Sequence, residues 1–156
     1  MTTTTPTPAT TASTRSTMSA SARRLRRSLA VGVGTAVGVG IWLIAVPGVG
    51  ADLAVTMAEG TARIGLGSVI VACVVAGLAG WGSLALLERL TTGAAKIWAF
   101  LAIAVTVISL LGPVGQAQSL EAALTLGAMH LGVGAALIGL LPMRGAGRTN
   151  APAGDR

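Results

Sequence analysis

Four long apolar runs, separated by short polar connections, dominate the pattern of hydrophobic and polar positions along the chain. The runs cover about residues 28–46, 64–87, 94–112 and 120–141. A helix rises about 1.5 Å per residue, so a run of roughly 20 residues is long enough to cross the hydrocarbon core of a bilayer. The pattern therefore predicts an all-α fold, a bundle of four transmembrane helices that forms a membrane domain at residues 23–143.

Prolines support the ends of these runs. Pro47, Pro113 and Pro142 follow the first, third and fourth runs, as expected for residues that cannot continue a helix. Gly112 with Pro113 is predicted to stop the third helix. The first connection, residues 48–63, mixes charged, small and apolar residues and is predicted to lie along the membrane interface.

The two ends of the chain have a different composition. Residues 1–22 are almost wholly Thr, Ser, Ala and Pro, and such a segment cannot bury enough apolar surface to offset the entropy of ordering. We predict a disordered N-terminal tail there and a flexible, Gly-rich C-terminal tail at residues 144–156. Met18 offers a second possible start of translation besides Met1, and either start leaves the predicted fold unchanged.

The first apolar run follows a cluster of arginines, an arrangement that also occurs in signal peptides. The run of residues 28–46 is longer than the roughly 7 to 15 apolar residues of a signal peptide. We therefore expect the first run to be retained as a membrane span.

Composition excludes an ordinary soluble domain. The chain of 156 residues is 53% hydrophobic and 10% charged, whereas a soluble domain has about 25% charged residues. The net charge of +6 does not indicate nucleic acid, because the basic residues lie in the tails and short connections. The lipid bilayer is the expected environment.

The distribution of Lys and Arg predicts the orientation. The N-terminal tail, the second connection and the C-terminal tail together hold 10 of the 11 basic residues, and the first and third connections hold only Arg63. The positive-inside rule then places both termini in the cytoplasm of a multi-pass protein of the cell membrane.

His130 is the sharpest chemical feature, because it is an ionisable residue near the middle of the fourth run. Such residues are costly in lipid and usually serve a function. Gly127 and Gly134 flank it at helical spacing, so we expect the imidazole to point into the bundle. Thr106 and Ser109, on one face of the third run, are its candidate partners in an intramembrane polar site. Because no intramembrane Asp, Glu, Lys or Arg is available to pair with it, we favour a structural histidine that is hydrogen-bonded across helices over a proton-accepting or ligand-binding site.

No further chemistry accompanies this histidine. Glu121 precedes it by nine residues, about 13 Å along a helix, which is too far for a shared metal. The single cysteine, Cys73, has no Cys/His cluster around it. We therefore predict no catalytic residue, no metal site and no cofactor.

Small residues at four-residue spacing predict where helices pack closely, since bare backbone permits close approach in lipid. The predicted packing residues are Gly34 and Gly38 in the first run, Ala72, Ala76 and Gly80 in the second, and Gly127 and Gly134 in the fourth.

Several short motifs carry a resemblance. They are Trp42 followed by Pro-Gly-Val-Gly-Ala-Asp-Leu at 47–53, Leu-Glu-Arg at 87–89, Ser-Leu-Leu-Gly-Pro at 109–113 and Met-His-Leu at 129–131. Over about residues 24–143 the chain resembles a family of uncharacterised four-span membrane proteins found mostly in actinobacteria. The resemblance implies four spans, with Ser109, Pro113 and His130 as recurrent features, and it implies no activity.

Two functions remain open from the sequence. The favoured one is a non-enzymatic bundle that associates with itself, as a homo-oligomer, or with another membrane protein. The alternative is a small transporter or ligand-binding membrane protein that uses His130 near the bilayer midplane.

Overall fold

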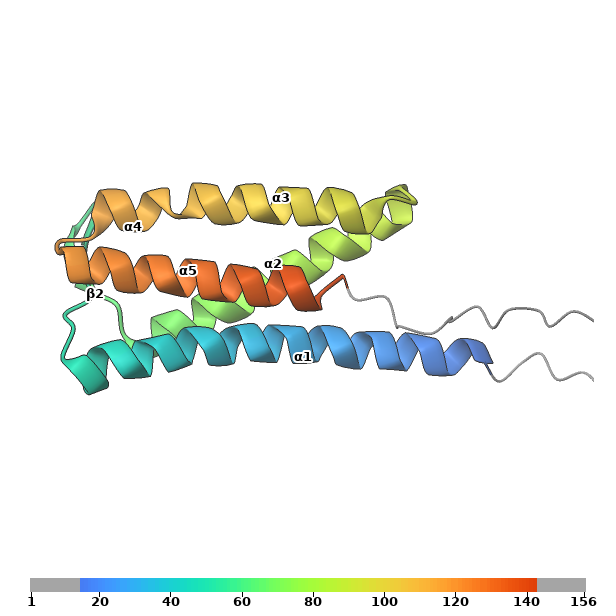
Figure 1. Ribbon diagram of the computed structural model, residues 1–156, viewed down its shortest axis with the longest axis horizontal. Coiled ribbons are helices and arrows are strands. Elements are labelled where there is room, and N and C mark those ends of the chain that lie inside the picture. Colours follow the sequence, from blue (N-terminus) through green and yellow to red (C-terminus); the bar gives the residue numbers. More distant parts are fainter. Residues whose placement is uncertain (1–14, 143–156) are drawn as a thin grey trace, which may run out of the picture.

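The computed structural model describes residues 15–142, and these form a bundle of helices with one small β-hairpin (Figure 1). In chain order the elements are α1 (Arg15–Leu43), η1 (Ile44–Gly48), β1 (Ala54–Met57), β2 (Gly60–Arg63), α2 (Leu66–Leu90), α3 (Ala94–Ser109), α4 (Leu111–Gln116) and α5 (Leu120–Leu140).

Four helical segments are long and apolar enough to cross a membrane. They are Ser21–Gly48, Leu66–Leu90, Ala94–Gln116 and Leu120–Leu140. The predicted all-α bundle with four candidate spans is thus confirmed. The helix of the first span starts at Arg15, inside the stretch predicted to be disordered. The rest of the predicted N-terminal tail and residues 144–156 lie outside the described residues.

The helices run alternately up and down. α1 begins and α5 ends at one end of the bundle, where the connection from α2 to α3 also lies; we call this the basic end (Figure 1). The β-hairpin and the connection from α4 to α5 lie at the opposite end, which we call the hairpin end.

α2 crosses behind the other helices at an angle (Figure 1). Near the hairpin end it packs against α1, where Cys73 meets Gly38 and Gly77 meets Val31. Near the basic end it packs against α3, because the indole N–H of Trp98 donates to the carbonyl of Gly80 at 3.0 Å. α2 therefore moves from α1 to α3 along its length.

The third span is a broken helix. α3 ends at Ser109 and α4 begins at Leu111, so Gly112 and Pro113 do not end the span as predicted. Pro113 lies in the first turn of α4, where a residue without a backbone N–H is tolerated because the first N–H groups of a helix have no intrahelical acceptor.

The first connection forms a β-hairpin, which the sequence analysis did not predict. β1 pairs with β2 in antiparallel register, with Ala54 opposite Arg63 and Met57 opposite Gly60. Gly60 adopts a φ of +123°, which glycine reaches without steric cost. The connection to α5 adds to this cap, since the Gln118 amide donates to the Thr61 hydroxyl at 2.7 Å.

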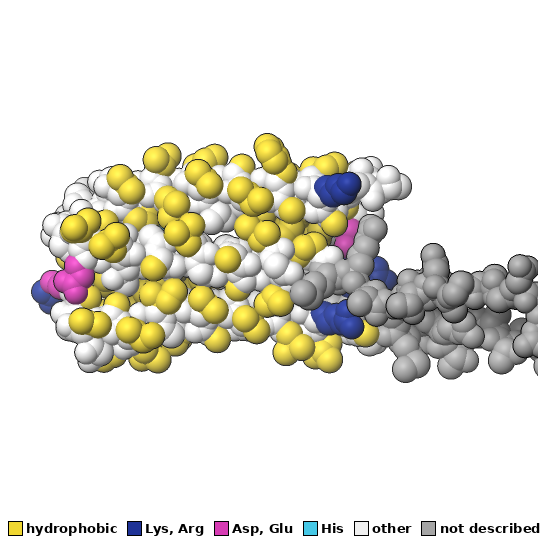
Figure 2. Space-filling view, viewed as in Figure 1, with side chains coloured by type: hydrophobic (Ala, Val, Ile, Leu, Met, Phe, Trp, Pro, Cys, Tyr) yellow, Lys and Arg dark blue, Asp and Glu magenta, His cyan; other side chains and the backbone are white. Residues whose placement is uncertain are grey.

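The core is narrow and the outer surface is apolar. Leu84, Trp98 and Met129 belong to the buried cluster at the centre of the bundle. Hydrophobic side chains cover much of the visible outer face of the helices, while charged groups are confined to its two ends (Figure 2). This distribution suits a bundle surrounded by lipid.

Candidate functional site

His130 does not point into the core of the bundle, contrary to the prediction. The buried positions of α5 are Ala122, Leu126, Met129, Val133 and Leu137. His130 lies at the edge of this stripe and is exposed. Because the stripe repeats every three to four residues, the position immediately after Met129 is turned by about 100° from it.

The imidazole of His130 is held by its own helix. Its Nδ1 atom lies 2.7 Å from the carbonyl oxygen of Leu126, one turn earlier in α5. A carbonyl can only accept, so Nδ1 carries the hydrogen in this contact. The Nε2 atom has no hydrogen-bond partner within residues 15–142. It is thus available to a group from outside the chain.

The proposed partners Thr106 and Ser109 also bond to their own helix. The Thr106 hydroxyl donates to the Ala102 carbonyl at 2.8 Å, and the Ser109 hydroxyl donates to the Thr106 carbonyl at 2.7 Å. No hydrogen bond joins either hydroxyl to His130 within the described part of the chain. The three residues do not form the polar network expected from the sequence.

Thr106 nevertheless lies close to the helix of His130. A Cβ added at Gly134 would be 2.7 Å from the Thr106 hydroxyl oxygen, so the two helices touch at this point. Gly134 is four residues after His130 and therefore on the same side of α5. His130 consequently lies on the side of α5 that faces α3, one turn nearer the hairpin end than the contact itself.

Most of the predicted packing glycines lie against a neighbouring helix. Gly34 faces Leu137, Gly38 faces Cys73 and Val133, and Gly80 faces Leu141 and Trp98. Gly127 differs from them, because nothing lies within 4 Å of a Cβ added there. It borders the exposed side of α5 that also carries His130.

Ala72 and Ala76 are exposed, so they do not pack within this chain. The small position of α2 that meets α1 is instead Gly77, where an added Cβ would lie 2.7 Å from Val31. Gly132 of α5, also missed by the sequence analysis, meets Val37 of α1. Small residues occur on several sides of these helices, and their spacing alone does not tell which side is buried.

One partly buried ion pair was also missed. Arg27 of α1 places Nη2 2.6 Å from Oε1 of Glu88 in α2, and the Arg27 side chain is only 10% exposed. The sequence did carry a signal for it, since Glu88 is the one acidic residue of the connection and helix ends at this end of the bundle. A lone carboxylate among many cations is expected to find a basic partner.

Metal binding receives no support from the described residues. Within residues 15–142 no three His, Cys, Asp or Glu side chains gather closely enough to hold a metal ion.

Exposed residues of α2 and α5 lie on the sides of their helices that are turned toward α3. Ala72 and Ala76 precede Ser83 by eleven and seven residues, so all three share a side of α2. Ser83 accepts a hydrogen bond from Trp98 of α3. Ala72 and Ala76 are therefore on the α3-facing side of α2, as His130 is on the α3-facing side of α5. We call Ala72, Ala76 and His130 the open face.

Comparison with known proteins identifies the family. Residues 18–147 match a family of unknown function, DUF6069, and the chain belongs to it. The family match agrees with the resemblance to uncharacterised proteins noted from the sequence. Neither the curated proteins nor the solved structures yield a match.

Proposed function

We propose that this protein is a non-enzymatic bundle of the cell membrane, with both termini in the cytoplasm, that acts by associating with a second copy of itself or with another membrane protein. The open face supports this proposal. It combines small side chains with an imidazole whose Nε2 atom has no partner within residues 15–142.

Ala72 and Ala76 support association because small side chains stabilise nothing when they face only lipid. The hydrophobic effect does not drive helices together inside a bilayer, so association depends on close backbone approach and on polar contacts. The other small residues of this bundle that face a neighbour, such as Gly77 and Gly134, are used for close contact. Ala72 and Ala76 are exposed and four residues apart, so they offer an equivalent close contact to an external helix.

His130 supplies a polar contact on the same face. An unpaired polar atom near the bilayer midplane is costly, and a hydrogen bond from a neighbouring helix removes part of that cost. The proposed partner is an external transmembrane helix that packs on Ala72 and Ala76 and donates a hydrogen bond to Nε2 of His130.

Cysteine crosslinking in native membranes tests self-association. In a Cys73→Ala background, Ala76→Cys should form disulfide-linked dimers upon oxidation. Ala135→Cys is the matched control, because Ala135 is exposed on α5, on the side opposite the buried Leu126. Crosslinking at both positions alike would indicate random collision and contradict a defined interface, as would the absence of dimers at Ala76→Cys.

A second candidate, a small transporter or ligand-binding protein, is favoured by one observation. The Nδ1 atom of His130 contacts Leu126, and Nε2, on an exposed side of α5, has no hydrogen-bond partner within residues 15–142. A small hydrogen-bond donor or a proton arriving through the membrane could use it. Proton or solute flux in vesicles that is lost with His130→Gln, while crosslinking persists, would favour this candidate over association.

A further inference from the structure

The basic end carries a surplus of positive charge. Six of the seven Lys and Arg residues between positions 21 and 142 lie there, against a single carboxylate, Glu88. The other three carboxylates of this range lie toward the hairpin end. The six cations are Arg23, Arg24, Arg26 and Arg27 of α1, Arg89 of α2 and Lys96 of α3.

Glu88 neutralises only one of these cations. It pairs with Arg27, whose side chain is 10% exposed and therefore withdrawn from the surface. Arg23, Arg24, Arg26, Arg89 and Lys96 are all exposed. The hairpin end does not have this surplus of positive charge. Within residues 15–142, Arg63 is paired there with Asp52, while Glu59 and Glu121 are exposed.

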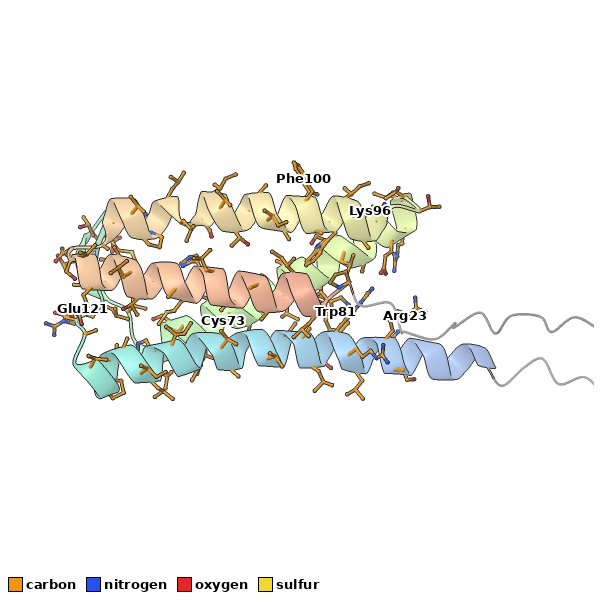
Figure 3. All side chains as sticks on the ribbon, viewed as in Figure 1. Arg23, Cys73, Trp81, Lys96, Phe100 and Glu121 are labelled. Atoms are coloured by element: carbon orange, nitrogen blue, oxygen red, sulfur yellow. The ribbon has the colours of Figure 1, made fainter. Side chains whose placement is uncertain are left out.

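The exposed cations belong to three different helices, but all of them lie at the same end of the bundle. Arg23 and Arg24 precede Arg27 by four and three residues, so they lie on the side of α1 that faces α2, one turn beyond the ion pair. Figure 3 shows Arg23 on α1 and Lys96 on α3 at the same end of the bundle. In Figure 2, dark-blue side chains appear at this end on both helices.

The same turns of α1 also expose large apolar side chains. Leu25 is 62% exposed and Leu29 is 57% exposed, both on the side of α1 away from Arg27. Contact with acyl chains is more favourable for such side chains than contact with water. Since the arginines occupy the same two turns, they stand at the depth where acyl chains meet the headgroups of the bilayer.

We propose that the basic end binds the headgroups of anionic phospholipids, with Arg23 and Arg24 of α1 and Lys96 of α3 each contacting headgroup phosphates. A guanidinium presents two parallel N–H donors that match phosphate oxygens, and an ammonium adds a point charge. Glu88 keeps Arg27 in the helix contact, so Arg27 stabilises the bundle and is not part of the lipid site. A zwitterionic lipid binds less well because its own cation offsets the phosphate.

Lipid competition on the purified full chain tests the proposal. The protein in mild detergent is offered phosphatidylglycerol and phosphatidylcholine in equal amounts, and the retained lipids are counted by native mass spectrometry. We expect wild type to retain phosphatidylglycerol preferentially. Each cation removed should weaken this binding about fivefold, the ratio that corresponds to ~1 kcal/mol per Lys or Arg near an anionic surface.

Three variants separate loss of lipid binding at the basic end from loss of charge elsewhere and from loss of folding. The triple variant Arg23→Gln, Arg24→Gln, Lys96→Gln should lose the preference, whereas Arg63→Gln at the hairpin end should keep it. The double variant Arg23→Lys, Arg24→Lys should keep most of it, because the charge is conserved. Helix content by circular dichroism verifies that each variant is folded.

Several results would overturn the proposal. Equal retention of both lipids by wild type would do so, and so would equal losses in the triple variant and in Arg63→Gln. Addition of inorganic phosphate should displace no more phosphatidylglycerol than sodium chloride of the same ionic strength. A larger displacement by phosphate would assign the basic end to soluble anions and contradict a lipid site.

Discussion

Arg27 and Glu88 join α1 to α2 through an ion pair of 2.6 Å, although they are 61 residues apart in the chain. The pair lies at the basic end, where α2 leaves α1 to reach α3. It therefore links α1 to the last turns of α2, beyond the contacts of Cys73 and Gly77 with α1. Its partial burial distinguishes it from the exposed pair of Arg63 and Asp52 at the hairpin end, whose side chains are 81% and 60% exposed.

Glu88→Gln should destabilise the protein, because it leaves the buried Arg27 cation without a counter-charge. Gln keeps an oxygen that accepts from Arg27, so the variant loses the counter-charge and not the hydrogen bond; since Glu88 is 36% exposed, we expect a loss of about 1 kcal/mol. Unfolding of the purified protein in micelles by a graded denaturant measures it. Asp52→Asn is the control, and an exposed pair should contribute between roughly 0 and 1 kcal/mol. Equal losses for both variants would contradict a special role for the pair.

Gly38 and Cys73 should show strong coupling in a double-mutant cycle. A Cβ at Gly38 would lie 2.6 Å from the Cys73 Sγ atom, so Gly38→Ala requires the Cys73 side chain or the two helices to shift. Such overpacking costs about 1 to 3 kcal/mol. Combining Gly38→Ala with Cys73→Ala removes the sulfur and should restore most of that loss.

Gly40→Ala is the matched control for this cycle, because nothing lies within 4 Å of a Cβ added at Gly40. It should be neutral or stabilise the helix by up to about 1 kcal/mol. If Gly38→Ala is as harmless as Gly40→Ala, the close contact of α1 with α2 is not present in the membrane.

The helices could be predicted from the sequence, but not which of their sides are buried. Runs of apolar residues exclude soluble alternatives and give the four spans directly. A helix that is hydrophobic all round carries no polar stripe to mark its outer side, so its orientation depends on side-chain shape. The spacing of Ala72 and Ala76 therefore does not tell whether they contact a helix of the same chain or of another, and the contact of Gly77 with Val31 is found only in the structure.

The hairpin and the ion pair were missed for other reasons. β1 and β2 have four residues each, and Ala58 and Glu59 between them are not typical hairpin-turn residues. Arg27 is one of four neighbouring arginines, and only the helix packing determines which of them reaches Glu88. Long-range pairs of this type require knowledge of how α2 crosses α1.

Fusion of a phosphatase that is active only outside the cytoplasm tests the orientation. Fusions after Met57 and Gln116 should be active, because both residues lie at the hairpin end. Those after Thr92 and Arg148 should be inactive, since Lys and Arg at the basic end favour the cytoplasm. An active fusion after Thr92 would contradict the proposed order of the four spans. Intact mass of the mature chain independently detects cleavage of the first span.

Replacement of His130 by Gln and by Leu separates its structural and functional roles. Both variants should fold with nearly wild-type stability, because the imidazole bonds only to its own backbone within residues 15–142. The free energy of unfolding should change by no more than about 0.6 kcal/mol, the average value of a polar side-chain contact in a membrane bundle. Denaturant titration in micelles measures this change.

The same two variants distinguish association from transport. If Nε2 of His130 accepts a hydrogen bond from a neighbouring helix, His130→Leu should reduce the crosslinking at Ala76→Cys about threefold, the ratio that ~0.6 kcal/mol corresponds to. Gln retains a hydrogen-bonding amide and should preserve the dimer. Gln cannot titrate near neutral pH, so a protein that carries protons through His130 should lose its flux with either replacement. Flux that survives both replacements, together with unchanged crosslinking, would exclude His130 from either function.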